Sequence, residues 1–287
     1  MWTSLLSATC CLLALQNGYG FVRSLPQTKS VRAGTTCFMS LIDRIRSAMT
    51  RQQPGGEIDR VVKCWDKFAT GVGVERFLDP PNNLVLQTAD CFVEGLSAMP
   101  FHQTESFPWA LSLEEHAAEI WKELSDYNNA QKAIQRKTLS AESEWLPPRD
   151  TAGSAYGPEW KTLGLQDRSV WDDGRVLEFP RTVKLLKQFN VPSCEVFFAK
   201  QGPKSGIKPH SDKNNFIITC HLALDVPEGE CWIQVGDTKY NWKNGKAVIF
   251  DTSIMHSTEN SSESERYVLL IRFWHPELTM PEQKAFK

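Results

Sequence analysis

The stretch GIKPHSDKNNFIITCHLAL, residues 206–224, joins a Gly/Pro-containing turn to a strongly apolar run and carries His210 and Asp212 two positions apart. Side chains two residues apart diverge on a helix but share one face of a strand. We therefore expect this imidazole and this carboxylate to form either a hydrogen-bonded pair or part of a metal site. The apolar run after them predicts a buried strand.

Short apolar segments separated by turns continue from here to the C-terminus. They are CEVFFAKQG (194–202), FIITCHLAL (216–224), CWIQV (231–235), TKYNW (238–242), KAVIFD (246–251) and RYVLLIRFW (266–274). Gly236-Asp237 and Asn244-Gly245 are hairpin signals. Regularly spaced short strands predict a mainly β protein with flanking helices, built as an antiparallel barrel or sandwich.

Helical patterns occupy the chain before these strands. Apolar side chains recur at helical spacing, which predicts helices at residues 38–52, 57–68, near 84–97 and 181–189. Ser112 and Glu115 form a capping-box pattern that would open another helix. Residues 145–167 are aromatic and rich in Gly and Pro, which indicates a long loop of the kind that forms lids or substrate walls. Trp109 either lines the same cleft or belongs to the core.

The N-terminus has the composition of a targeting segment. An apolar run from Leu5 to Leu15 is too short for a membrane span and typical of a signal-peptide core. Residues 21–36 are rich in Ser, Thr and Arg and contain no acidic residue, as in transit peptides. The combination resembles the bipartite plastid presequences of algae with complex plastids, with the endoplasmic reticulum lumen or secretion as the alternative. No later segment predicts a membrane span.

Composition sets the outer limits of the interpretation. The chain has 287 residues, 41% of them hydrophobic and 23% charged, with a net charge of −2. This balance supports a substantial core and gives no reason to expect a nucleic-acid partner. The eight cysteines include no CxxC pair, so we expect buried small side chains and no zinc site. We divide the chain into a presequence (1–37), a helical N-terminal region (38–96) and a catalytic domain (97–287).

A second histidine completes a possible metal site. His256 follows the strand KAVIFD, and in a jelly-roll barrel a strand pair leading out and back returns the chain to the same mouth. His210, Asp212 and His256 would then converge there. Two imidazoles and one carboxylate on one face of a metal are the ligands of non-haem Fe(II) oxygenases. An isolated His-x-Asp pair is more often a surface or capping feature.

An arginine on the next predicted strand strengthens the metal interpretation. Arg266 begins RYVLLIRFW, and a guanidinium near such a metal can bind a carboxylate of 2-oxoglutarate through two parallel hydrogen bonds. The alternative is a surface arginine beside Glu263 and Glu265.

Residues 208–279 together resemble the catalytic core of the aspartyl/asparaginyl β-hydroxylase family. The resemblance rests on the HLAL strand at 221–224, the IFD that precedes His256, the downstream arginine and the closing WHPELT at 274–279. Weaker similarity extends back to about residue 97. The resemblance implies a double-stranded β-helix core (jelly-roll, cupin-like), with His210 and His256 as iron ligands and Arg266 as the main anchor for 2-oxoglutarate. His221 matches a histidine that contacts the cosubstrate, or it is a buried structural histidine.

This sequence departs from the family pattern at three positions. Asp212 stands where some members have Gly, so a full ligand triad is present here. Thr219 replaces a family arginine, and Ala199 replaces an oxygen-bearing residue. Both replacements affect the anchoring of 2-oxoglutarate. The residues that we considered as compensation are Lys200, Lys208 and Asn215.

The resemblance implies an Fe(II)- and 2-oxoglutarate-dependent dioxygenase that uses O₂ and releases succinate and CO₂. The family name implies hydroxylation at the β-carbon of Asp or Asn in a polypeptide, while a small-molecule substrate is also compatible with the sequence. Two alternatives remain open: a cupin-like metalloenzyme that does not use 2-oxoglutarate, and a non-catalytic binding domain on the same fold. We interpret His275, within WHPELT, as structural.

Overall fold

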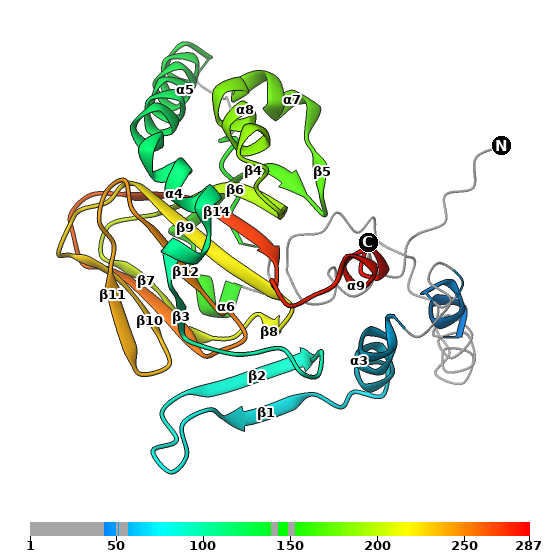
Figure 1. Cartoon of the computed structure of the whole chain (residues 1–287). Coiled ribbons are helices and arrows are strands. Elements are labelled where there is room, and N and C mark those ends of the chain that lie inside the picture. The colour runs from blue at the N-terminus through cyan, green and yellow to red at the C-terminus, as the bar shows by residue number, and fades with distance from the viewer. Residues whose placement is uncertain (1–42, 50, 52–56, 139–142, 149–152) are drawn as a thin grey trace, which may run out of the picture.

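The computed structural model describes residues 43–49, 51, 57–138, 143–148 and 153–287 (Figure 1). The predicted presequence lies outside these residues. Among the described helices, none is long and apolar enough to cross a membrane.

Two β-sheets face each other and form the body of the protein (Figure 1). The smaller sheet has the strand order β11-β10-β13-β7 and the larger one β3-β12-β9-β14-β6-β4-β5. The strands of the smaller sheet are β7 (Ser205–His210), β10 (Cys231–Val235), β11 (Thr238–Asn241) and β13 (His256–Asn260). Those of the larger sheet are β3 (Phe101–His102), β4 (Trp160–Asp167), β5 (Val170–Trp171), β6 (Ser193–Gln201), β9 (Ile217–Asp225), β12 (Ala247–Phe250) and β14 (Arg266–Trp274).

The path of the chain identifies the fold. From β6 onward it alternates between the sheets, with β6, β9, β12 and β14 in the larger and β7, the β10–β11 hairpin and β13 in the smaller. The ladders within both sheets are antiparallel. Strands that wind alternately through two facing antiparallel sheets form a double-stranded β-helix. The prediction of a mainly β protein with this core is therefore confirmed.

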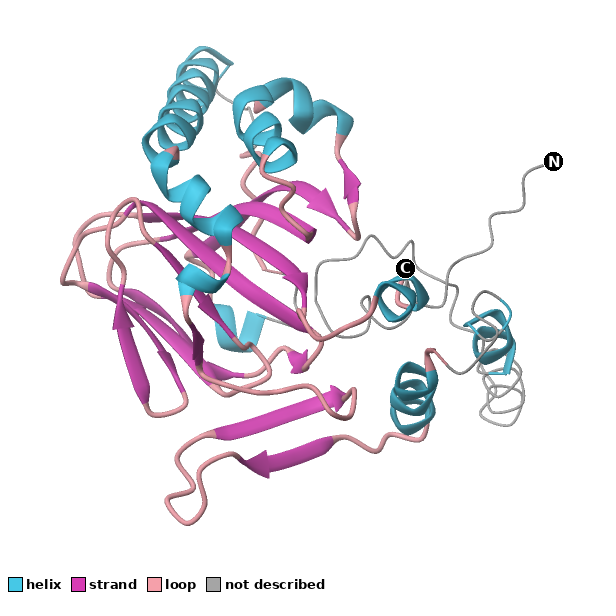
Figure 2. Cartoon of the chain, viewed as in Figure 1, coloured by secondary structure: helices cyan, strands magenta, loops and turns pink. Residues whose placement is uncertain are grey.

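Alternation along β9 explains how the larger sheet separates two cores. Cys220 and Leu222 point outward into a cluster covered by helices, whereas Ala223 lies in the cluster between the sheets. The outer face is covered by helices α4, α5, α7 and α8 (Figure 2). Their bounds are α4 (Pro108–Glu115), α5 (Ala117–Thr138), α7 (Asp173–Glu178) and α8 (Pro180–Gln188). Because odd-numbered residues of β9 face inward, His221 points between the sheets, opposite to Cys220.

The N-terminal region contains a β-hairpin that the sequence did not predict. Helix α3 (Asp59–Ala69) matches the prediction for 57–68. Strand β2 (Leu86–Cys91), which forms a hairpin with β1 (Val74–Phe77), stands where a helix was predicted near 84–97. That prediction is wrong because β2 pairs antiparallel with β1 and parallel with β8 (Lys213–Asn214), so tertiary pairing decides its conformation. The division of the chain at residue 97 stays a prediction.

The C-terminal segment packs against the N-terminal region. Helix α9 (Met280–Ala285) begins with a capping box of Thr279 and Glu282. Its Ala285 and the following Phe286 share a buried cluster with Trp65 of α3. The N-terminal region therefore packs on the same body as the barrel.

Three further local predictions are wrong. Ser112 lies inside α4, and the break between α4 and α5 falls at His116, so Ser112 and Glu115 form no capping box. Residues 160–167 of the predicted loop form β4, because they pair with β6; a short helix, α6 (Gly153–Tyr156), precedes them. Asn244-Gly245 connects β11 to β12, which lie in different sheets, so it is not a hairpin turn.

Other local predictions are confirmed. The six predicted strands and the helix at 181–189 are present, and Gly236-Asp237 is the turn of the β10–β11 hairpin, with Gly236 at φ 59°. The described cysteines are all buried: Cys64, Cys91, Cys194, Cys220 and Cys231.

Candidate metal centre and cosubstrate pocket

The three predicted metal ligands meet at one mouth of the barrel. His210 is the last residue of β7, His256 is the first of β13, and the two are direct partners in the antiparallel ladder. Asp212 follows β7 in the link to β8, so the pair lies at a strand end and not along one strand face. Ligand atoms of the three side chains lie within 4.8 Å of one another, which is close enough for one ion to bind all three.

Backbone carbonyls orient both imidazoles toward the centre of the cluster. The Nδ1 atoms of His210 and His256 lie 2.8 Å from the carbonyl oxygens of Lys208 and Ile254. An Nδ1–H that donates to a carbonyl leaves the lone pair on Nε2, and this arrangement is common for metal-bound histidines. Burial and the neighbouring His210 lower the pKa of His256 to about 4, so its imidazole is neutral at pH 7. The donor set therefore suits a divalent cation.

The carboxylate of Asp212 is ionised although it is buried. Burial raises its pKa, but the guanidinium of Arg272, with Nη2 at 3.4 Å from Oδ2, and the neighbouring polar side chains together lower it by a larger amount, so the net shift is downward. The backbone N–H of Asp212 donates to the carbonyl of Thr252 at 2.8 Å, which fixes the link that carries the carboxylate.

The N-terminal hairpin holds both segments that carry these ligands. The backbone N–H of Thr88 donates to the carbonyl of Ser253 (2.8 Å), and the hydroxyl of Ser211 donates to the carbonyl of Thr88 (2.6 Å). The buried amide of Gln87 donates to the hydroxyl of Ser253 (2.7 Å). Strand β2 thus connects the loop before His256 to the loop after His210.

Tyr156 is a site residue that the sequence did not single out. Its hydroxyl lies 3.0 Å from Nε2 of His210 and 3.5 Å from Oδ1 of Asp212. Its ring packs against Trp160, with the centroids 4.7 Å apart. The only signal in the sequence was its position in the aromatic segment 145–167, which was predicted to form a wall of the site.

Arg266 is buried on the inner face of β14 and has no carboxylate partner among the described residues. It is 1% exposed, donates from Nη2 to the side-chain oxygen of Gln201, and lies 4.3 Å over the ring of Trp242. Its Nε has no hydrogen-bond acceptor in the described part of the chain. Burial lowers its pKa to about 10. An uncompensated buried guanidinium fits an anionic ligand.

The surface alternative for Arg266 is wrong. Glu265 pairs with Lys200 at 2.7 Å, and Glu263 pairs with Lys204 at 3.0 Å. Neither carboxylate forms an ion pair with the buried guanidinium.

His221 lies between Arg266 and the metal cluster. Its ring stacks on Trp242 with a centroid distance of 5.8 Å and meets Phe250 edge-on at 4.9 Å; Phe250 in turn lies 6.0 Å from His256. Burial and the nearby Arg266 hold the pKa of His221 well below its usual value, so it is neutral.

Nδ1 of His221 and Nε1 of Trp242 are buried and have no hydrogen-bond partner among the described residues. Together with Nε of Arg266, these orphaned polar atoms fit a dicarboxylate such as 2-oxoglutarate that extends from the metal cluster to Arg266.

The two departures that affect the anchoring of 2-oxoglutarate, Thr219 and Ala199, lie on the same inner face. Thr219 is buried with no partner for its hydroxyl among the described residues, and Ala199 is part of the cluster between the sheets. Of the residues considered as compensation, Lys200 pairs with Glu265, and Asn215 is bonded to both backbone groups of Val93. Lys208 is exposed. Instead, Arg272 lies directly opposite Thr219 in the β9–β14 ladder. Its signal in the sequence was a charge within the apolar run RYVLLIRFW.

Two other predicted positions lie outside the site. Trp109 packs edge-on against Phe107 and Phe273 in the outer core, with centroid distances of 6.1 and 5.2 Å. Nε2 of His275 bonds the carbonyl oxygen of Ser97 at 3.1 Å, consistent with a structural role.

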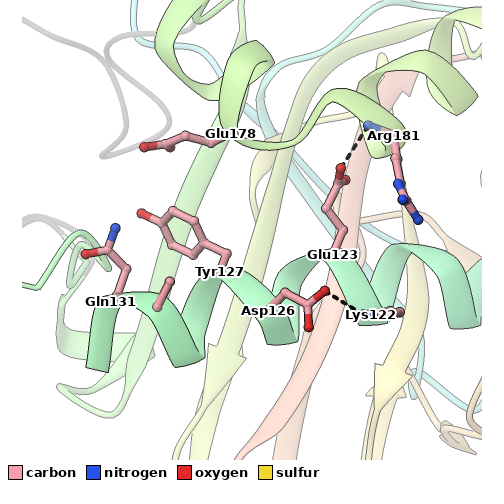
Figure 3. Close-up of a pocket in the computed structure, with 8 residues that line it drawn as sticks. Lys122, Glu123, Asp126, Tyr127, Gln131, Glu178 and Arg181 are labelled. Carbon is pink, nitrogen blue, oxygen red and sulfur yellow. Dashed lines mark hydrogen bonds and ion pairs between the residues drawn. The ribbon is translucent and has the colours of Figure 1, made fainter. Parts of the chain in front are cut away.

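A surface pocket also lies away from the metal cluster, on the helical side of the larger sheet (Figure 3). Its charged side chains are largely engaged with their neighbours: Lys122 pairs with Asp126 at 2.6 Å, and Glu123 accepts from the backbone N–H of Arg181 at 2.9 Å.

The fold and the cluster define a class: a double-stranded β-helix with a His-Asp-His candidate iron site at its mouth. The family model for aspartyl/asparaginyl β-hydroxylase matches residues 114–276. The chain belongs to this enzyme family.

Individual relatives agree with the family match. The chain is 28% identical to the aspartyl/asparaginyl β-hydroxylase of Mus musculus over 171 residues, which cover 55% of this chain and 23% of the mouse protein. It is 27% identical to the ornithine lipid ester-linked acyl 2-hydroxylase of Rhizobium tropici over 184 residues, 62% of this chain and 61% of that enzyme. Among solved structures, a prolyl-4-hydroxylase of Pseudomonas putida aligns with a TM-score of 0.35 and 16% identity, covering 58% of this chain and 98% of that one.

Proposed function

We propose that this protein is an Fe(II)- and 2-oxoglutarate-dependent dioxygenase that hydroxylates a C–H bond. The observation that carries the proposal is the combination of His210, Asp212 and His256 at one mouth with the buried Arg266 on the adjoining inner face, which has no carboxylate partner among the described residues. When bound, the iron and 2-oxoglutarate supply the oxidising chemistry, in which one oxygen atom of O₂ enters the substrate and the other enters the succinate that forms with CO₂.

The residues of this chain would bind and orient these groups. The two imidazoles and the ionised carboxylate of Asp212 would present three donors on one face of the ion, so the other face would be left for ligands. Arg266 binds the distal carboxylate of 2-oxoglutarate, and Trp242 and His221 form the apolar wall along it. Burial of this pocket excludes water from the reacting groups.

For the substrate we propose the β-carbon of an Asp or Asn side chain in a polypeptide. Support comes from the family match and from the similarity to the mouse aspartyl/asparaginyl β-hydroxylase. An acyl chain of a lipid is the second candidate. The observation that favours it is coverage, because the match extends over 61% of the Rhizobium lipid hydroxylase but only 23% of the mouse protein.

The decisive experiment measures 2-oxoglutarate turnover. Protein from residue 40 onward is supplied with Fe(II), 2-oxoglutarate and O₂, and succinate is quantified with and without a library of Asp- and Asn-containing peptides or acyl lipids. We expect slow uncoupled succinate formation that a true substrate accelerates and that His256→Ala abolishes. Iron binding without succinate formation would favour a cupin-like metalloenzyme of another reaction type. Failure to bind iron would favour a non-catalytic binding domain.

We also propose that residues 1–37 direct the protein into the secretory route, with the plastid as the favoured destination. Support comes from the apolar run Leu5–Leu15 and the acid-free residues 21–36. A fusion of residues 1–37 to a fluorescent protein, expressed in an alga with a complex plastid, tests this: plastid fluorescence supports it, and cytosolic fluorescence contradicts it.

A further inference from the structure

A second buried guanidinium lies at the metal end of the larger sheet. Arg272 of β14 is 5% exposed and is placed by the ladders opposite Thr219 on one side and Glu195 on the other. Its Nη2 lies 3.4 Å from Oδ2 of Asp212, and its Nη1 lies 3.4 Å from Oε2 of Glu195. It therefore contacts a proposed metal ligand directly, from the strand that also carries Arg266.

The donors of Arg272 are far from satisfied. A guanidinium has five N–H donors, and the hydrogen bond from Nη1 to Glu195 is long. Nε and Nη2 are buried and have no hydrogen-bond acceptor among the described residues. A buried charged donor without a hydrogen-bond acceptor is costly, so folded proteins keep such donors mainly where a ligand completes them. These donors lie beside the metal cluster, since Asp212 is the nearest carboxylate to Nη2.

Charge balance indicates that the ligand beside Arg272 is an anion. Without a metal, the carboxylate of Asp212 is the counter-charge on the Nη2 side of Arg272. A divalent cation bound by Asp212 would compete for that same carboxylate. The metal and the guanidinium would then carry three positive charges against at most two negative charges on Asp212 and Glu195, and an anion beside both would neutralise the excess.

We propose that Arg272 is the second cationic anchor of the site: it occupies the place left by Thr219, holds Asp212 through Nη2 and binds a carboxylate next to the metal. The carboxylate belongs either to the metal-proximal end of 2-oxoglutarate or to the substrate. The inference rests on the proposed function. It also explains how this chain can carry Thr219 in place of the family arginine: the guanidinium comes from the paired position on β14 instead of from β9.

The test compares binding and not turnover, with Mn(II) as a redox-inert metal. Calorimetric titrations give the Kd of Mn(II), then the Kd of 2-oxoglutarate for the Mn(II) form, then the Kd of N-acetyl-aspartyl amide for the form loaded with both. The variants are Arg272→Gln and Arg272→Lys, the ladder swap Arg272→Thr with Thr219→Arg, and the distant control Arg181→Gln. Thermal unfolding of each variant shows whether it is folded.

If Arg272 is an anchor, its replacement should change the carboxylate affinity and the Mn(II) affinity in opposite directions. We expect Arg272→Gln to weaken carboxylate binding at least tenfold while Mn(II) binds equally or more tightly, because Asp212 loses a competing cation. A purely structural role would weaken both. Arg272→Lys should lose less carboxylate affinity than Arg272→Gln, and the swap should recover most of it. If Arg272→Gln does not fold, the folded Lys variant and the swap decide.

The two sources of the carboxylate are separated by the probes. A shift in the Kd of 2-oxoglutarate assigns Arg272 to the cosubstrate, and a shift only in the Kd of N-acetyl-aspartyl amide assigns it to the substrate. No shift in either overturns the inference. If the unmodified protein binds Mn(II) and 2-oxoglutarate, that failure leaves the proposed function standing; if it binds neither, the proposed function itself fails.

Discussion

Replacement of Arg266 by Met separates its cost to the fold from its use in binding. Methionine keeps an unbranched chain against Trp242 but removes the charge. The guanidinium has no carboxylate partner among the described residues, so the ligand-free protein carries its burial cost without compensation. Among the described residues, the hydrogen bond to Gln201 and the cation–π contact with Trp242 oppose this cost, and methionine replaces the second with a sulfur–aromatic contact of similar size.

The magnitude follows from the pKa of Arg266, which burial lowers from the usual arginine value to about 10. A tenfold change in a protonation equilibrium is worth about 1.4 kcal/mol, so the buried charge costs the folded state about 3 kcal/mol. At pH 7 the group is charged in the folded and the unfolded chain, since both pKa values lie higher; the cost is therefore fully present at neutral pH. Losing the charged hydrogen bond to Gln201 offsets about 1.5–3 kcal/mol.

Ligand-free Arg266→Met should therefore be as stable as the unmodified protein or up to about 2 kcal/mol more stable. Its Kd for 2-oxoglutarate should rise at least about a hundredfold, because a buried ion pair worth about 3 kcal/mol or more loses one partner. Urea unfolding and calorimetric titration of the Mn(II) form measure the two effects. Arg168→Met, on the surface beside Asp167, is the control and should change neither. A variant that is more than about 2 kcal/mol less stable but binds 2-oxoglutarate normally would refute the reasoning.

Three other substitutions test the surroundings of the site. Burial raises the pKa of Asp251 to about 6, above its unfolded value, so stability should fall as the pH rises from about 4 to 6; Asp251→Asn should flatten that slope in urea unfolding curves, and an unchanged slope would contradict the assignment. Tyr156→Phe removes the hydroxyl that bonds Nε2 of His210 in the metal-free protein, so Mn(II) should bind about two- to tenfold more tightly by calorimetry; weaker binding would instead make the phenol a ligand. Gln87→Leu removes the buried donor to the hydroxyl of Ser253, so it should lower the free energy of unfolding by about 1–3 kcal/mol and also weaken Mn(II) binding. A loss of stability with unchanged Mn(II) affinity would show that the hairpin does not position the ligands.

The strands of the barrel were predictable because their information is local. The segments from 194 to 274 alternate or run apolar over five to nine residues, and turn residues separate them. Each of these segments proved to be a strand of the double-stranded β-helix. The hairpin at 74–91 was not predictable in this way, since β2 includes buried polar residues such as Gln87 and Thr88 whose hydrogen-bond partners, Ser253 and Lys213, are far away in sequence.

The residues of the candidate site were likewise predictable only where the signal is local in the sequence. His210, Asp212 and His256 could be selected because their residue types are rare in combination and they lie next to predicted strands. Tyr156 could not, because nothing near it in the sequence announces that its hydroxyl reaches His210. The candidates considered as compensation for Thr219 were chosen by their position in the chain, and the ladder showed that position in the sheet is what matters.

By itself, the sequence determined the fold class and the types of ligand side chain at the mouth of the barrel, because strand periodicity and residue identity are local properties of the sequence. Only the tertiary structure decided which strands are neighbours, and with them three contacts of the site: β2 against the loops that carry the ligands, Trp242 beneath Arg266, and Arg272 opposite Thr219. The physical reason is that a buried charge is compensated by whatever lies within a few ångströms of it, and in an antiparallel sheet those neighbours come from strands that are distant in the chain.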